Sequence, residues 1–200
     1  MSDKKIVVVD IDNTIHESDI TLNLASMELF NSPFKWCQQG EWYKGGHEKM
    51  PMENALEVFD RIYDRDMIFL TRPYVGSKSG LEKIQSLGYE ILYYTDRPAS
   101  AHANTYDWLV EHDLPNPNGL KCCGDKRASL AEIKDSIATV IDDRVRTMLF
   151  VQHELGIEKV FSIRQPYNQN LTDAPNIFIR HTWTELSEVF VAEMGEYAGE

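Results

Sequence analysis

Short, uninterrupted apolar runs alternate with longer amphipathic stretches along most of the chain. Four clear runs and a weaker fifth stand out: Ile6–Val9, Ile91–Tyr94, Ala138–Ile141, Val160–Ile163 and Asn176–Ile179. Continuous runs of β-branched and aromatic residues are typical of strands that are buried on both faces. We therefore expect these five segments to be strands of one sheet.

The stretches between these runs have apolar residues at helical spacing. Leu81, Ile84 and Leu87 recur every three residues before Gly88, which is a natural helix end. Further helices are expected over residues 101–112, 129–135 and 145–155. Strands that alternate with helices form a parallel sheet covered on both faces. The pattern predicts an α/β fold with a Rossmann-like parallel sheet.

One region, from about residue 16 to residue 75, breaks this alternation. It is mostly helical in pattern: Glu53–Tyr63 has helical spacing, whereas Met67–Leu70 fits either a short strand or a buried turn. We interpret residues 16–75 as a helical insertion after the first strand. Residues 1–15 and 76–200 would then form the core.

Acidic residues follow three of the predicted strands. Asp10 and Asp12 follow the first, Asp96 the second, and Asp142 and Asp143 the third. Ligands of an open parallel sheet bind at the carboxyl ends of its strands, so these acids should converge there. Such a cluster repels itself unless a cation neutralises it, and ligation by oxygen alone favours Mg²⁺. The spacing therefore predicts a magnesium site.

The pair Asp10 and Asp12 suggests phosphoryl chemistry at this site. One carboxylate can attack phosphorus while a metal reduces the repulsion of the phosphate. The other, two residues on, can protonate the leaving oxygen and later activate water. A capping aspartate at a strand–helix turn would account for either acid alone.

These segments resemble the motifs of haloacid dehalogenase-superfamily phosphatases. Asp10-Ile11-Asp12-Asn13-Thr14 resembles the first motif, DxDxT after an apolar strand. Ile91–Thr95 resembles the second, an apolar strand ending in Ser or Thr, and Val140–Asp143 resembles the fourth, which ends in paired acids. The third motif is a lone lysine: Lys126 is the best match, with Lys121 and Lys134 as rivals.

The resemblance implies a role for each matched residue. Asp10 would be the nucleophile that forms an aspartyl-phosphate, and Asp12 the general acid/base, with its backbone carbonyl on the metal. Thr95 would hydrogen-bond the phosphoryl group, and Lys126 would balance the charge on it and on Asp10. The metal would be Mg²⁺.

The remaining metal ligands would be Asp142 and Asp143, either directly or through water. Arg97, which follows Thr95 closely, would contact the phosphate or form a structural salt bridge. The insertion matches in position the helical cap of one class of the superfamily, and caps exclude water and select substrates.

Aromatic side chains of the insertion have two interpretations. Trp36, Trp42, Tyr43 and His47 would stack on a substrate or fill the cap's own small core. The six histidines show no metal-ligand spacing, and we expect them at surface or helix-face positions.

The amino-acid composition restricts which classes of partner the protein is expected to bind. The 200 residues carry 20 Lys+Arg and 32 Asp+Glu, a formal net charge of −12, which disfavours long nucleic acids. Three cysteines, without paired spacing, and no apolar window of membrane-spanning length favour a cytoplasmic protein that does not enter a membrane. The sequence leaves self-association open.

The expected function is Mg²⁺-dependent phosphomonoester hydrolysis of a small phosphorylated substrate, with nucleotides as candidates. Thr95–Pro98, Asp142–Arg144 and Arg164–Asn168 resemble segments of deoxyribonucleotidases, although the first motif departs from the Asp-x-Asp-Gly-Val form common there. One alternative is a 3′-phosphatase acting on polynucleotide ends. An alternative of another class is a catalytically silent protein that binds phosphate or metal.

Overall fold

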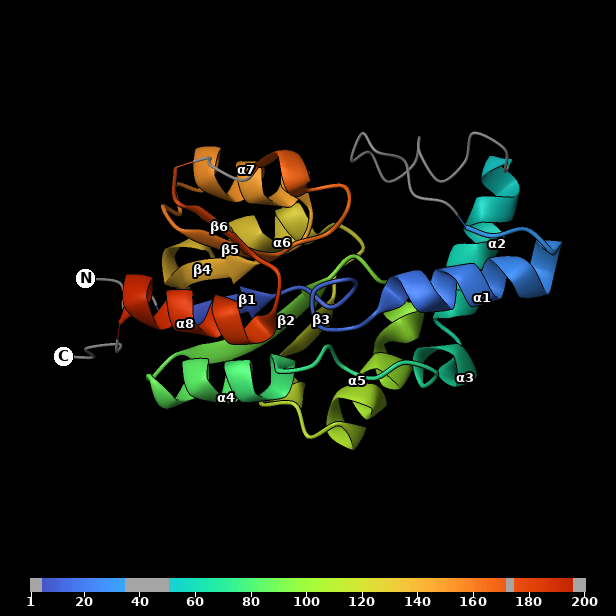
Figure 1. Cartoon of the computed structure of the whole chain (residues 1–200), viewed down its shortest axis with the longest axis horizontal. Coiled ribbons are helices and arrows are strands. Elements are labelled where there is room, and N and C mark those ends of the chain that lie inside the picture. The colour runs from blue at the N-terminus through green and yellow to red at the C-terminus, as the bar shows by residue number, and fades with distance from the viewer. Residues whose placement is uncertain (1–4, 35–50, 172–174, 196–200) are drawn as a thin grey trace.

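Six parallel strands form the centre of the protein, in the order β3-β2-β1-β4-β5-β6 (Figure 1). The computed structural model describes residues 5–34, 51–171 and 175–195. The strands are β1 (Ile6–Val9), β2 (Glu90–Thr95), β3 (Leu120–Cys122), β4 (Ile137–Ile141), β5 (Val160–Ile163) and β6 (Ile177–Arg180). The five predicted strands are confirmed. The sequence did not reveal β3, because its three residues are too few to show a strand pattern.

Helices cover both faces of the sheet, as the alternating pattern predicts (Figure 1). In Figure 1, α4 and α8 lie on one side of the sheet and α6 and α7 on the other. The bounds of the helices that follow the insertion are α4 (Ser77–Ser86), α5 (His102–Glu111), α6 (Lys126–Glu132), α7 (Val145–His153) and α8 (Trp183–Met194). Helix α8 was not predicted, and the helix predicted over residues 129–135 begins three residues later than α6 does.

The central strand β1 shows how the two faces are built. Val7 and Val9 pack into the hydrophobic cluster that contains Trp183 of α8. Val8, between them, packs into the opposite cluster with Met148 of α7. Successive side chains of a strand point to opposite faces, so an unbroken apolar run is needed when both faces are covered.

Among the described residues between β1 and α4 there are three helices, α1 (Ser18–Phe30), α2 (Met52–Ile62) and α3 (Arg65–Ile68). Their apolar side chains form a separate small cluster. The strand interpretation of Met67–Leu70 is wrong, because α3 ends in this segment. Its consecutive residues Met67 and Ile68 pack into two different clusters, which explains the short apolar run.

A cap function for residues 16–75 stays a prediction. The aromatic residues Trp36, Trp42, Tyr43 and His47 lie outside the described residues. None of the helices in the described ranges has both the length and the apolar character that crossing a membrane requires.

Candidate active site

A tight turn after β1 places the first acidic residue at the carboxyl edge of the sheet. The backbone N–H of Asp10 donates to the carbonyl of Ile141 on β4, 2.9 Å away, which continues the pairing of β1 with β4. Asn13 then adopts a positive φ of 56°. Asparagine tolerates this left-handed conformation better than most residues, so the chain can reverse immediately after Asp12.

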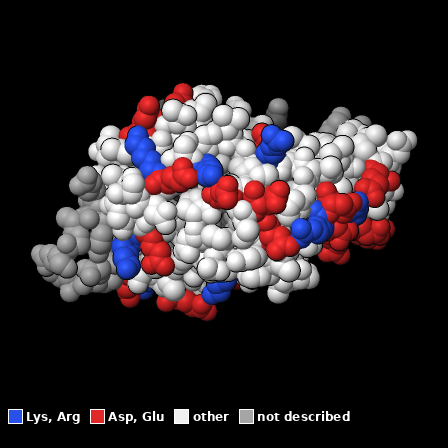
Figure 2. Space-filling model, turned by 90° about the horizontal axis from the view of Figure 1, so that it is seen from below, with Lys and Arg blue, Asp and Glu red and all other residues white. Residues whose placement is uncertain are grey.

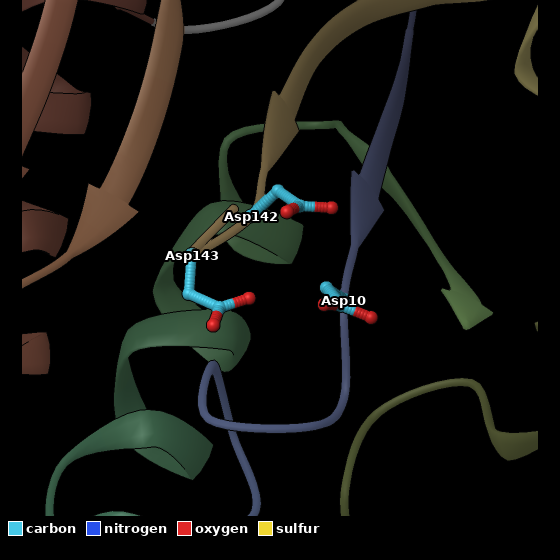
Figure 3. A group of neighbouring side chains, drawn as sticks. All are labelled: Asp10, Asp142 and Asp143. Carbon is cyan, nitrogen blue, oxygen red and sulfur yellow. The ribbon is translucent and has the colours of Figure 1, made fainter. Parts of the chain in front are cut away.

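Asp10, Asp142 and Asp143 come together at this edge, and we call them the carboxylate cluster. Figure 3 shows Asp10 just after the end of β1 and the other two just after the end of β4, with their carboxylates around a common space. One oxygen from each lies within 4.8 Å of the other two, and all three residues are buried. The convergence that the strand pattern predicts is present for these three acids.

Lys126, the first residue of α6, is buried against the cluster. Its Nζ lies 3.0 Å from Asp10 Oδ1 and 2.5 Å from Asp142 Oδ2. Burial alone would lower the pKa of Lys126, but the two carboxylates outweigh it and raise that pKa above its usual range. Of its rivals, Lys121 pairs with Glu132 at the surface and Lys134 begins a short turn.

A second cation, Arg144, also lies at this edge of the sheet. Its Nη1 donates to Asp96 Oδ2 at 2.6 Å. Burial raises the pKa values of Asp10 and Asp143, and the charge of Arg144 offsets part of that rise. Asp96 in turn accepts the backbone N–H of Lys126 at 2.8 Å. Asp96 therefore positions Lys126 and Arg144 beside the cluster, which the sequence analysis did not foresee.

The carboxylate cluster keeps an excess of negative charge. Burial and mutual repulsion raise the pKa of Asp143 well above its usual value, and burial raises that of Asp10 despite Lys126. All three side chains offer oxygen, which hard divalent cations prefer. The three oxygens lie within 4.8 Å of one another, so one cation between them would be near all three. The residues present fit a magnesium ion.

Asp12 occupies a different environment, two residues along. Arg97 binds it through two nitrogens, with Nη2 2.7 Å from Oδ1 and Nε 3.0 Å from Oδ2. Ser18 donates to Oδ1 at 2.5 Å and Thr95 to Oδ2 at 3.4 Å. Burial would raise the pKa of Asp12, but the charge and hydrogen bonds of Arg97 outweigh it and hold that pKa well below its usual range.

The predicted site residues thus fall into two groups. Lys126 lies with the carboxylate cluster, whereas Thr95 and Arg97 lie with Asp12. Arg97 was expected either to contact the phosphate or to form a structural salt bridge. The structure shows a salt bridge, with Asp12. A general acid must hold a proton, so Asp12 can act as one only after its contact with Arg97 weakens.

His16 contradicts the expectation of a surface histidine, since it is only 1% exposed. Its Nδ1 lies 2.8 Å from Ser18 Oγ, and its Nε2 lies 2.8 Å from Thr71 Oγ1 and 3.1 Å from the Ile68 carbonyl. Burial lowers the pKa of His16 to about 3, which keeps the imidazole neutral. No spacing in the sequence predicts the burial of His16, because its hydrogen-bond partners come from separate elements.

The helical insertion also contributes a side chain near Arg97. The ring centroid of Tyr63, which follows α2, lies 5.6 Å from the guanidinium carbon of Arg97. By contrast, Arg72, where the insertion returns to the core, is exposed.

No family model and no curated protein matches the sequence. Solved structures do match. A haloacid dehalogenase-like hydrolase from Streptococcus pneumoniae has 17% identity and a TM-score of 0.67, covering 95% of this chain and 100% of its own. A predicted phosphoglycolate phosphatase from Haemophilus somnus has 15% identity and a TM-score of 0.62, covering 94% and 99%.

A third structure was solved with phosphate and sodium bound. This haloacid dehalogenase-family hydrolase from Deinococcus radiodurans has 13% identity and a TM-score of 0.59, covering 98% of this chain and 97% of its own. At such low identities the likeness concerns the fold. The chain therefore has the haloacid dehalogenase-like fold along nearly its whole length.

Proposed function

We propose that this protein is a phosphomonoester hydrolase of the haloacid dehalogenase type, with Asp10 as the nucleophile. The observation that carries the proposal is the contact of Lys126 Nζ with both Asp10 and Asp142 inside the carboxylate cluster. A carboxylate can approach a phosphate only where positive charge offsets their repulsion. The fold shared with named phosphatases, and the phosphate bound to one neighbouring structure, support the same conclusion.

In the proposed reaction, a carboxylate oxygen of Asp10 bonds to phosphorus as the ester oxygen leaves with its electron pair. Asp12 gives that oxygen a proton, and the aspartyl-phosphate remains on Asp10. Asp12 then takes a proton from water, whose oxygen attacks phosphorus and breaks the bond between phosphorus and Asp10, so that inorganic phosphate leaves and Asp10 is again a free carboxylate. Lys126 balances charge on Asp10 and the phosphoryl group throughout.

A magnesium ion would be held by Asp10, Asp142 and Asp143, with the backbone carbonyl of Asp12. When bound, it would supply positive charge that lowers the repulsion between nucleophile and phosphate. Thr95 and Arg97 would bind phosphoryl oxygens. If Arg97 shifts its hydrogen bonds from Asp12 to the phosphate, substrate binding itself frees Asp12 to carry the proton.

The proposed substrate is a small phosphorylated metabolite, with nucleotides as the first candidates. Acidic and basic side chains are interspersed on the face seen in Figure 2, which lacks the continuous basic stripe that a long nucleic acid needs. The formal net charge of −12 points the same way. Tyr63, whose ring lies beside Arg97, would contact the organic part of a substrate whose phosphate binds Arg97.

A substrate panel tests this proposal. Phosphate release would be measured from mononucleotides, sugar phosphates and a 3′-phosphorylated oligonucleotide, in Mg²⁺ and in EDTA. We expect Mg²⁺-dependent release from a small substrate, and a loss of about a thousandfold or more in Asp10→Asn. Asp113→Asn is the matched control, because Asp113 is exposed and Asn suits its positive φ of 49°.

Each other outcome has a defined meaning. Preference for the oligonucleotide would favour a polynucleotide 3′-phosphatase. Binding of Mg²⁺ or phosphate without any turnover would indicate a catalytically silent binding protein. Full turnover in Asp10→Asn would refute the nucleophile assignment.

A further inference from the structure

The loop that follows β5 reaches back to the carboxylate cluster, and we propose that it positions Asp143 for the divalent ion through the hydroxyl of Tyr167. Tyr167 would be a positioning residue, since it contacts the ligand and not the ion. The inference rests on the proposed function, because it concerns the metal that this function requires. Three observations lead to it.

The first observation is that the loop is closed on itself and tied to the backbone of Asp143. The Gln165 N–H donates to Asn168 Oδ1 at 2.8 Å, and the Asn168 N–H donates to the Gln165 carbonyl at 3.2 Å. Asn168 Nδ2 donates to the carbonyls of Asp143 and Ile163, both at 3.0 Å. Asn168 is fully buried, so its amide fixes the loop at a set distance from Asp143.

The second observation is the contact that this loop delivers. The Tyr167 hydroxyl donates a hydrogen bond to Asp143 Oδ2 and accepts one from Asn13 Nδ2 at 3.2 Å. Gln165 Nε2 also donates to the Asn13 carbonyl at 2.7 Å. The loop therefore connects the turn after Asp10 with the carboxylate of Asp143, from two strands that are neighbours in the sheet.

The third observation concerns charge. Lys126 and Arg144 hold acids of this site by pairing with them, and each pairing cancels part of the negative charge that attracts a cation. Tyr167 is neutral, so it can orient Asp143 and leave its full charge available. It also engages only one carboxylate oxygen, Oδ2. The other oxygen, Oδ1, accepts a longer hydrogen bond of 3.5 Å from Thr14 Oγ1. Without the Tyr167 bond, we expect this weaker contact to hold Asp143 less firmly against the repulsion from Asp10 and Asp142.

Hydrogen bonds to metal ligands have a known order of effect, since their removal typically costs tenfold to a hundredfold in metal affinity. We therefore expect Tyr167→Phe to raise the Mg²⁺ dissociation constant about 10–100-fold. The measurement is calorimetric titration of the full chain with MgCl₂, without substrate. Tyr106→Phe is the matched control, because its hydroxyl donates to the exposed Asn118 and lies away from the cluster.

Activity supplies a second readout. In Tyr167→Phe, half-maximal turnover should need about 10–100-fold more Mg²⁺, while kcat at saturating Mg²⁺ stays close to that of the parent. A purely structural role would lower kcat or the melting temperature of the metal-free protein and leave the Mg²⁺ requirement unchanged. Unchanged Mg²⁺ affinity in Tyr167→Phe would overturn the inference.

A second variant guards against misfolding of the first. Asn13→Gly removes the amide that donates to the Tyr167 hydroxyl, together with its two hydrogen bonds with Asp19, and keeps a residue that accepts positive φ. Of the lost hydrogen bonds, the neutral one to Tyr167 is the one that leads to the carboxylate cluster, and its loss predicts a rise of about fivefold in the Mg²⁺ dissociation constant. A parent protein that binds no Mg²⁺ would defeat the proposed function itself, whereas normal binding by the parent and by both variants would defeat only this inference.

Discussion

Asp10 and Asp12 are the same residue type, two positions apart, and both are buried, yet their environments push their pKa values in opposite directions. Burial raises the pKa of Asp10 despite the nearby Lys126, with Asp142 adding to the rise. Arg97 holds the pKa of Asp12 below its usual range. The carboxylate cluster shares its cations among several acids, whereas Asp12 has Arg97 to itself.

This difference shows what decides whether a buried acid is satisfied. Burying a charge is costly unless a partner compensates for it. The Asp12–Arg97 pair is complete within the protein and needs nothing further. The carboxylate cluster is incomplete without an added cation, and the same shortage makes it a candidate metal site.

Asp12→Asn should have the largest effect on stability, because it leaves the buried guanidinium of Arg97 without a counter-ion. Breaking a buried ion pair from one side typically costs about 3–5 kcal/mol. Urea unfolding in EDTA would measure the loss, with Asp113→Asn as the exposed control. An unfolding free energy equal to that of the parent would show that Arg97 finds another partner, and the contrast with the cluster would fail.

Mg²⁺ should stabilise the parent through the carboxylate cluster. At a free concentration one hundred times the dissociation constant, a ligand that binds only the folded state adds about 2.7 kcal/mol. Urea unfolding with and without MgCl₂ measures this gain. Asp143→Asn should lose most of it, since it removes one of the three clustered oxygens. Equal stabilisation of that variant would place the metal elsewhere.

The pH dependence of stability tests whether His16, buried near Asp12, stays unprotonated in the folded protein. Its folded pKa of about 3 lies below the unfolded value near 6.5, so below pH 6.5 only the unfolded chain takes up the proton. Stability should therefore fall as the pH drops from 6.5 towards 3, by about 1.6 kcal/mol between pH 6.5 and 5.

The difference between the parent and His16→Gln isolates this contribution. The variant should be less stable at pH 7 but lose less stability on acidification, as urea unfolding at several pH values would show. His153→Gln, at an exposed position, should keep the parent's pH dependence. Parallel curves for the parent and His16→Gln would mean that His16 is protonated in the folded protein.

The sequence predicted the carboxylate cluster because parallel strands bring their carboxyl ends together whatever the details of packing. To predict that Asp10, Asp142 and Asp143 meet, only the strand assignments had to be correct. The pairing of Asp12 with Arg97 could not be derived in this way. It joins residues 85 positions apart, and it depends on how the turn after β1 and the turn after β2 face each other.

Helix α8 was predictable and was overlooked. Thr182 and Glu185 form a capping box, in which each side chain bonds the other's backbone N–H, and this spacing ahead of an apolar run signals a helix start. His16 carried no such signal. Its burial depends on Ile68 and Thr71, which the insertion returns to it from more than fifty residues away.

The smallest expected effect is a change in stability when one acid of the carboxylate cluster is neutralised without a metal. In EDTA at pH 7, Asp143→Asn should raise the free energy of unfolding by about 0.5–2 kcal/mol, the usual gain from one stabilising substitution. The reason is the raised pKa of Asp143, whose ionised form is disfavoured in the folded state by burial and by its acidic neighbours.

The stability difference between Asp143→Asn and the parent should depend on pH. A carboxyl with a raised folded pKa contributes most to stability at low pH, and it loses that contribution as the pH rises above about 4. The advantage of the neutral amide should therefore vanish near pH 4, where the unfolded chain also binds the proton. Urea unfolding at pH 4 and pH 7 separates this from a packing effect, because a packing gain would be the same at both. A variant less stable than the parent at pH 7 in EDTA would mean that Lys126, Arg144 and Tyr167 already satisfy the cluster without a metal.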